Sequence, residues 1–135
     1  YIIIFKRIYF NMKNKEEILR TIEIENYIWI IYLVIIFLSF MANKEEVNYF
    51  INNDMQSKSN YRKLIIIIFS IVLGIYYYFF VSGYKTYKSL SPYDTESKKF
   101  FETINFIANI LILISGVIFL FIAIFDKELE TEIAF

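Results

Sequence analysis

Residues 104–125, INFIANILILISGVIFLFIAIF, form a run of 22 residues without a charged side chain. At about 1.5 Å per residue, a helix of this length measures about 33 Å, which is enough to cross the roughly 30 Å hydrocarbon core of a bilayer. Two more uncharged stretches, residues 26–43 and 64–84, have the same character. We therefore predict an all-α integral membrane protein with three transmembrane helices.

The composition supports a membrane protein over a soluble one. Of the 135 residues, 58% are hydrophobic and 21% are aromatic, with three Gly and one Pro. A soluble domain of this size would have too few polar residues to cover its surface. The apolar residues also occur in long blocks, and a soluble helix would space them along one face. We expect a single three-span domain over residues 12–135.

Several classes of function are excluded by missing residue types. The chain has no Cys and no His, so thiolate nucleophiles, His general bases and the usual zinc ligands are absent. Fourteen basic residues balance fourteen acidic ones, which gives no overall attraction to nucleic acid. We expect a protein that is not an enzyme, with no catalytic residue, no cofactor, no metal and no nucleic-acid partner.

The codon preference implied by the composition indicates an AT-rich bacterial host, since Ile, Phe, Tyr, Lys and Asn are abundant. Residues 1–11 have no starting Met, whereas Met12 and the charged residues after it resemble a bacterial amino terminus. Lys6, Arg7 and Ile8 could be encoded by a ribosome-binding sequence. Our hypothesis is that residues 1–11 are a translated leader; a truncated fragment or an interfacial segment is the alternative.

The first span has a short amphipathic lead-in. Ile18, Leu19 and Ile22 share one helical face of residues 14–25, and charged residues occupy the other. This pattern predicts a helix near the lipid headgroups. Aromatic and basic side chains mark the ends of membrane spans, so we expect interface anchors at the start of the first span, at Tyr27 and Trp29, and just after its end, at Lys44.

The second span carries small residues at helical spacing. Ser70 and Gly74 lie four residues apart, which lets another helix backbone approach closely. We expect a turn at residues 57–60 before this span, and a helix break at Gly83 followed by a linker over residues 85–90. The expected interface anchors are Arg62, Lys63, Tyr76, Tyr77 and Tyr78; an aromatic binding box is the alternative interpretation of the three tyrosines.

The third helix is predicted to be longer than its span. Ser91, Pro92 and Asp94 resemble a helix start, with Ser as N-cap and Pro at the first helical position. We expect this helix to run from about Pro92 to Phe125, so that its first turns stand outside the hydrocarbon.

In a helix each residue is rotated by about 100° from the one before it. On this basis, small and polar residues of the third helix fall within one arc of about 100°. Carboxamides facing lipid would be costly, so this stripe is expected to face protein, most simply the other two spans. A path for a polar substrate is the alternative, but no ionisable residue at depth supports it. The stripe consists of Asn105, Ala108, Asn109, Gly116 and Ala123.

The orientation follows from the basic residues on each side of the membrane. Counted from Met12, seven lie on the side of the amino terminus and the second loop, and five lie on the opposite side. Basic residues favour the cytoplasm, so we expect the amino terminus inside and the carboxyl terminus outside the bacterial cell membrane.

Four segments carry a resemblance to other sequences: ENYIWIIYLVIIFLSFMAN (25–43), the YRK before the second span, SPYD (91–94) and LISGVIFLFIAIFDKELETEIAF (113–135). Together they resemble a group of small three-span membrane proteins predicted in AT-rich anaerobic bacteria. The resemblance covers nearly everything from Met12 onward. It implies the same architecture and location, and it implies no activity or functional residue.

Functional alternatives follow from the three-span architecture. Bacterial lipid kinases have a similar size and use a Glu-xx-Asn-xxx-Glu arrangement, but here Glu102 and Asn105 are followed by Asn109 in place of the second carboxylate. A holin-like or immunity-type membrane protein is a second alternative. We favour a protein that acts through helix contacts as an accessory subunit, a regulator or a self-assembling module. Its partners would be the lipid bilayer and itself or another membrane protein.

Overall fold

A computed structural model describes the backbone of residues 2–127 and the side chains of residues 15–127. Three helices account for nearly all of the described backbone: α1 (Ile2–Asn52), α2 (Met55–Lys88) and α3 (Glu96–Phe125). All three are long and apolar enough to cross a membrane. The predicted all-α membrane fold with three spans is therefore confirmed. The described residues contain no strand.

Helix α1 continues without interruption from the lead-in through the first span. It has no Gly or Pro between Ile2 and Asn52, so nothing in the sequence stops it. The chain divides into two units, Tyr1–Phe37 and Leu38–Phe135, and the division falls inside this helix. The second unit contains the end of α1 together with α2 and α3.

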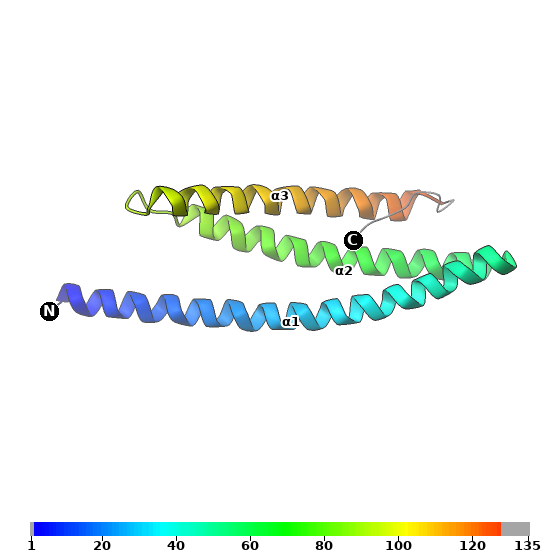
Figure 1. Ribbon diagram of the computed structural model, residues 1–135, viewed down its shortest axis with the longest axis horizontal. Coiled ribbons are helices and arrows are strands. Elements are labelled where there is room, and N and C mark those ends of the chain that lie inside the picture. Colours follow the sequence, from blue (N-terminus) through cyan, green and yellow to red (C-terminus); the bar gives the residue numbers. More distant parts are fainter. Residues whose placement is uncertain (1, 128–135) are drawn as a thin grey trace. The chain divides into compact units, whose positions relative to one another are not determined.

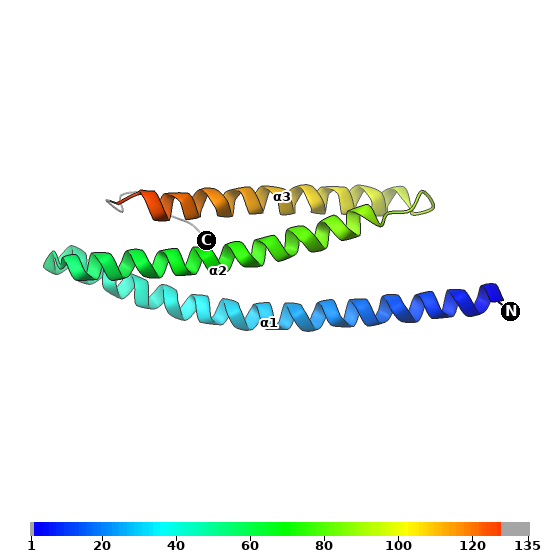
Figure 2. The same cartoon turned by 180° about the vertical axis from the view of Figure 1, so that it is seen from behind.

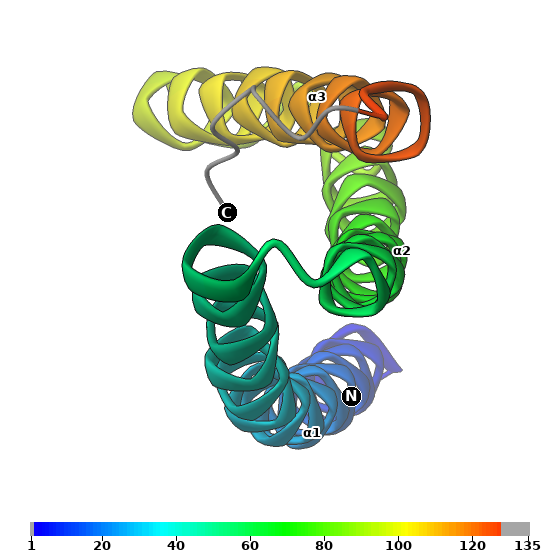
Figure 3. The same ribbon diagram turned by 90° about the vertical axis from the view of Figure 1, so that its right-hand side faces the viewer.

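The predicted turn at residues 57–60 is wrong, because α2 already begins at Met55. Only Asn53 and Asp54 separate α1 from α2. The end-on view shows a short connection between the two helices (Figure 3). Asn53 has a φ of 51°, a left-handed conformation that Asn tolerates better than most residues. Asp54 is the N-cap of α2, and its Oδ1 accepts a hydrogen bond from the Gln56 amide at 3.0 Å. The chain thus reverses with two residues.

Polar side chains hold this reversal together. Ser57 is buried, and its hydroxyl accepts from Asn48 Nδ2 at 2.5 Å and donates to Asp54 Oδ2 at 3.2 Å. Asn48 Nδ2 also donates to Asp54 Oδ2 at 3.2 Å. Each member therefore satisfies another's polar group, which makes a buried polar cluster stabilising. We call Asn48, Asp54 and Ser57 the junction cluster.

Helices α2 and α3 lie side by side in antiparallel directions (Figures 1 and 2). Ring contacts show the direction: Phe69 early in α2 meets Phe119 late in α3 at 5.9 Å, and Phe80 late in α2 meets Phe106 early in α3 at 5.8 Å. The buried residues of α2 recur at helical spacing along one side of the helix. They are Ser57, Ile65, Ile68, Phe69, Val72, Ile75 and Gly83.

The predicted break at Gly83 and the linker over residues 85–90 are wrong, because α2 continues to Lys88. A single Gly costs a helix only about 1 kcal/mol, which a packed neighbouring helix can offset. Ser89 caps the helix, and its amide donates to the carbonyl of Lys85 at 3.1 Å. The connection between α2 and α3 therefore lies later in the chain than expected, over residues 89–95.

The third helix is extended beyond its uncharged run, as predicted, but its expected start at Pro92 is wrong. Helix α3 begins at Glu96 with Thr95 as N-cap, whose hydroxyl accepts from the Lys98 amide at 3.1 Å. Ser91 and Asp94 instead close a turn: the Ser91 amide donates to Asp94 Oδ2 at 2.7 Å and the Asp94 amide to the Ser91 carbonyl at 3.0 Å. The Ser-Pro-x-Asp sequence is a turn signal as well as a helix-start signal.

Candidate helix-contact surface

The contact between α2 and α3 is built around three residues of the predicted α3 stripe. Asn109 and Gly116 pack directly against α2, and Ala123 is buried at the same seven-residue spacing. Side chains seven residues apart return to the same face of a helix, so these positions follow one line along α3. We call Asn109, Gly116 and Ala123 the packed side of α3.

Gly116 is required by its neighbours on α2. A Cβ at this position would lie 2.9 Å from Tyr76 Cδ2 and 3.2 Å from Leu73 Cδ1. Both distances are shorter than ordinary carbon contacts of about 3.5–4.0 Å. The missing side chain therefore allows Tyr76 and Leu73 to approach the α3 backbone, as small residues do where membrane helices pack. Tyr76 is thus a packing residue at this contact as well as an expected interface anchor.

Gly83 plays the matching part on α2. A Cβ at Gly83 would lie 2.6 Å from Asn109 Nδ2 and 3.8 Å from Phe106 Cδ2. Asn109 therefore lies over the α2 backbone at a position where a Cβ would come too close to its amide nitrogen. Within the described residues the Asn109 carboxamide is in close contact with α2 but has no hydrogen bond.

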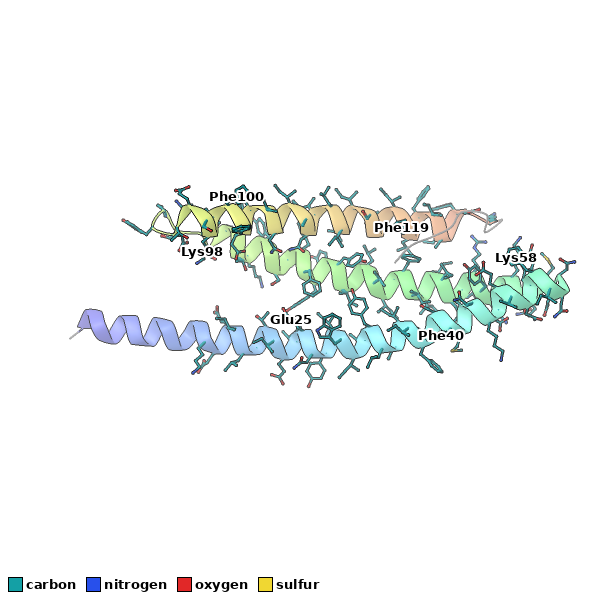
Figure 4. All side chains as sticks on the ribbon, in the orientation of Figure 1. Glu25, Phe40, Lys58, Lys98, Phe100 and Phe119 are labelled. Atoms are coloured by element: carbon teal, nitrogen blue, oxygen red, sulfur yellow. The ribbon has the colours of Figure 1, made fainter. Side chains whose placement is uncertain are left out.

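An aromatic cluster closes the contact at the end of α2. Phe106 stacks on Tyr87 with centroids 5.1 Å apart and an interplanar angle of 11°, and it also meets Phe80 and Tyr84 at 5.8 Å each. Phe119 faces α2, whereas Phe100 points away from it (Figure 4). The aromatic residues of α3 thus differ in role according to the side they occupy.

Four residues of the predicted contact surface remain outside this contact. Asn105 and Ala108 are exposed, although they belong to the same stripe as Asn109. Ser70 is exposed, and its hydroxyl donates to the Ile66 carbonyl of its own helix at 2.7 Å. A Cβ at Gly74 would meet nothing within 4 Å. We call Ser70, Gly74, Asn105 and Ala108 the open set.

The predicted interface anchors lie in different environments. Arg62 does more than mark an interface, because its Nη2 donates to the Ile124 carbonyl in the last turn of α3. A guanidinium at this position also complements the negative end of the helix dipole. Tyr78 is half-buried beside Phe79. The remaining anchors are exposed: Tyr27, Trp29, Lys44, Lys63 and Tyr77.

The carboxyl group of Asp94, in the turn between α2 and α3, has a lowered pKa. The hydrogen bond from the Ser91 backbone amide holds the pKa of Asp94 below its ordinary value, and the nearby ammonium of Lys98 acts in the same direction. Lys98 Nζ lies 3.4 Å from Asp94 Oδ1. Among the described residues, no group of three or more acidic side chains is arranged to hold a metal ion.

Sequence reasoning missed Gly83 and the junction cluster. The sequence pattern indicates a helix break at Gly83, yet a lone Gly in an uninterrupted apolar helix without Pro is equally a signal of close helix approach. The junction cluster depends on which polar side chains meet after the chain reverses, and no spacing rule gives that.

Comparisons of the chain with protein-family models, with curated proteins and with solved structures gave no match.

Proposed function

We propose that this chain is a small multi-pass membrane protein that acts through helix contacts and catalyses no reaction. It would serve as an accessory subunit, a regulator or a self-assembling module. The observation that carries this proposal is the open set. Three of the seven predicted helix-packing residues are packed inside the chain, and the other four, the open set, are exposed.

The outward carboxamide of Asn105 is the strongest member of this surface. Within the part of the chain that the structure describes, it has no hydrogen bond, and it lies in the uncharged run of α3. An amide in hydrocarbon gains from a polar partner on another helix, by about 0.6–1.7 kcal/mol in membrane proteins. Gly74 and Ala108 add positions where a second helix can approach closely.

The experiment compares substitutions in the open set with matched ones on the packed side. Gly74→Leu and Ala108→Leu should leave the α2–α3 pair intact, because neither position is enclosed. They should weaken the crosslinked complexes of the protein in its native membrane. Since the chain has no Cys, cysteines at Phe69 and Phe119, whose rings meet at 5.9 Å, can report the α2–α3 pair through a bifunctional thiol crosslinker. Unchanged crosslinked complexes in both variants would contradict the proposal.

We also propose that the protein resides in a bacterial cytoplasmic membrane with the amino terminus inside. Seven basic residues on the amino-terminal side against five on the other support this orientation. Reporter fusions at the two ends test it. A carboxyl-terminal reporter that is active in the cytoplasm would overturn it.

A further inference from the structure

The start of α2 lies between the end of α1 and the end of α3. The Tyr61 hydroxyl interacts with the Glu46 carboxylate of α1. Nη2 of the next residue, Arg62, donates to the Ile124 carbonyl of α3. Successive residues of a helix are about 100° apart, so the two neighbours lie on sides of α2 that meet at about a right angle. The end-on view shows this arrangement (Figure 3). We call the space bounded by Glu46, Tyr61, Arg62 and Ile124 the corner.

The floor of the corner, formed by α2, is basic. Residues 55–63, the start of α2, contain three basic residues and no acidic one. Lys58 precedes Arg62 by one turn, and its Nζ lies 5.3 Å from the ring centroid of Tyr49 on α1. Within the described residues, Nε of Arg62 is buried and has no hydrogen-bond partner. A buried donor without an acceptor is costly, so the floor favours an anionic group.

The α1 side of the corner carries an exposed aromatic side chain. Phe50 follows Glu46 by one turn, so it points to the same side of α1, and it is 68% exposed. The first span ends just before Lys44, and Phe50 lies six residues after Lys44, about 9 Å along the helix axis. The headgroup region is only about 5–7 Å deep on each side of the hydrocarbon, so Phe50 stands beyond it. A protein segment that covers Phe50 would remove apolar surface from water.

The segment that follows α3 has complementary chemistry. Residues 128–135 lie outside the described residues, and their sequence is ELETEIAF. This segment contains three acidic residues and no basic one, and the acidic residues alternate with Leu, Thr and Ile. Alternate side chains of an extended chain point to opposite sides. The pattern therefore allows carboxylates on one side and apolar groups on the other.

The segment also begins close to the corner. Helix α3 ends at Phe125, directly after the residue whose carbonyl Arg62 contacts. Eight extended residues span up to about 26 Å, whereas packed helices lie only about 8–10 Å apart. Phe50 is about 6 Å further than Glu46 along the axis of α1. Residues 128–135 are therefore long enough to cross the corner and reach Phe50.

We propose that the corner binds residues 128–135 of the same chain. The glutamates face Lys58 and Arg62, where a carboxylate supplies the acceptor that Nε of Arg62 lacks, and the apolar side chains cover Phe50. The corner is thus a docking site for an acidic and apolar peptide segment, which the proposed function does not include. It lies outside the hydrocarbon, whereas the open set lies in the spans, so the two surfaces can be tested separately.

The first test measures disulfide formation within the full chain in membranes, which the absence of natural Cys makes clean. One variant carries cysteines at Phe50 and Ile133. The matched control carries cysteines at Asn52 and Ile133. Phe50 and Asn52 are both exposed at nearly the same height, but they lie about 200° apart around α1. The disulfide through Phe50, the corner disulfide, should form at least about tenfold faster, because docking raises the effective concentration of the two thiols.

The second test changes the charge of the floor. Lys58→Glu should slow the corner disulfide about tenfold, because it places a carboxylate opposite the acidic segment. Lys63→Glu makes the same charge change about 140° around α2, away from the corner, and should have little effect. Salt at about 1 M, where the Debye length is about 3 Å, should also slow the corner disulfide. The α2–α3 crosslink described above reports whether each variant keeps its fold.

Four outcomes would overturn the inference. They are equal rates at Phe50 and Asn52, no disulfide at either position, a corner disulfide that Lys58→Glu leaves unchanged, and a disulfide that joins two chains and not one. If the inference fails while substitutions in the open set still weaken crosslinked complexes, the proposed function stands alone. If the corner disulfide behaves as expected and the open set shows no effect, the inference stands and the proposed function is wrong.

Discussion

The packed side of α3 and its exposed flank differ less in sequence than in environment. Asn109 and Gly116 pack against α2, whereas Asn105 and Ala108 are exposed on the same helix. Both pairs consist of one carboxamide and one small residue within the uncharged run. The difference teaches that a small or polar residue in a span indicates a contact, but does not tell which helix makes it.

The seven-residue spacing explains which residues are packed. Asn109, Gly116 and Ala123 remain on one line along α3, and α2 offers Gly83 and Tyr76 opposite that line. Ala108 is one residue from Asn109 and so lies about 100° around the helix. A residue can therefore share a broad arc with the packed side and still miss the neighbouring helix.

The largest expected effect is on the aromatic cluster. Phe106→Ala removes three ring contacts, each worth roughly 0.5–1.5 kcal/mol, so the free energy of unfolding should fall by about 3 kcal/mol. Phe101 is 65% exposed and meets only Phe100 among the described rings, so Phe101→Ala is the matched control. Steric trapping or denaturant titration in detergent measures the difference. Equal losses in the two variants would contradict the distinction between the sides.

The next effect compares two glycines. Gly116→Leu forces a side chain into Tyr76 and Leu73, and overpacking of this kind costs about 2 kcal/mol. Gly74→Leu meets nothing within 4 Å and should leave the stability of the isolated chain nearly unchanged. The same unfolding measurement applies. A destabilising Gly74→Leu would show that the α2 surface at Gly74 is covered within the chain.

A smaller effect is expected at the junction cluster, where polar contacts replace the apolar ones of the α2–α3 pair. Ser57→Ala removes a buried hydroxyl and both of its hydrogen bonds, at a cost of about 1 kcal/mol. Ser59 is half-buried without a hydrogen bond in the described structure, so Ser59→Ala serves as control. Hydrogen exchange of the first turns of α2 should rise in Ser57→Ala alone. A similar rise in the control would argue against the cluster.

The smallest effect concerns pH at the turn between α2 and α3. The pKa of Asp94 is lower in the folded chain than in the unfolded one, so its ionised form favours the turn. This contribution is complete above the ordinary aspartate value of about 3.9 and is lost as pH falls through the lowered pKa. NMR titration of the Ser91 amide should follow that transition. In Asp94→Asn the titration should be absent; its persistence would assign it to another group.

Much of the fold follows from local sequence, and the errors lie at particular residues. The uncharged run at residues 104–125 needed no tertiary information, because its length alone matches a bilayer. The expectations at Gly83, Pro92 and residues 57–60 are wrong for one reason. Gly, Pro and Ser are compatible with both helix and turn, and packing against a neighbouring helix decides between them.

The sequence predicts which residues are suited to helix packing, but it does not predict which of them contact α2. Asn105, Asn109, Gly116, Ser70 and Gly74 could all be recognised as helix-packing residues from their spacing. Which of them face α2 depends on the rotation of each helix about its own axis. That rotation is fixed by the sum of many weak side-chain contacts along both helices.

The sequence by itself determined that this protein has three helices able to span a membrane, since uncharged length and backbone hydrogen bonding leave a lipid-embedded chain little other choice. Only the tertiary structure decided that Gly83 receives Asn109, that Gly116 receives Tyr76, and that Ser70, Gly74, Asn105 and Ala108 remain outside. The physical reason is that a lipid environment favours helix formation but does not favour any rotation of the helix about its own axis. Close packing between helices therefore sets that rotation.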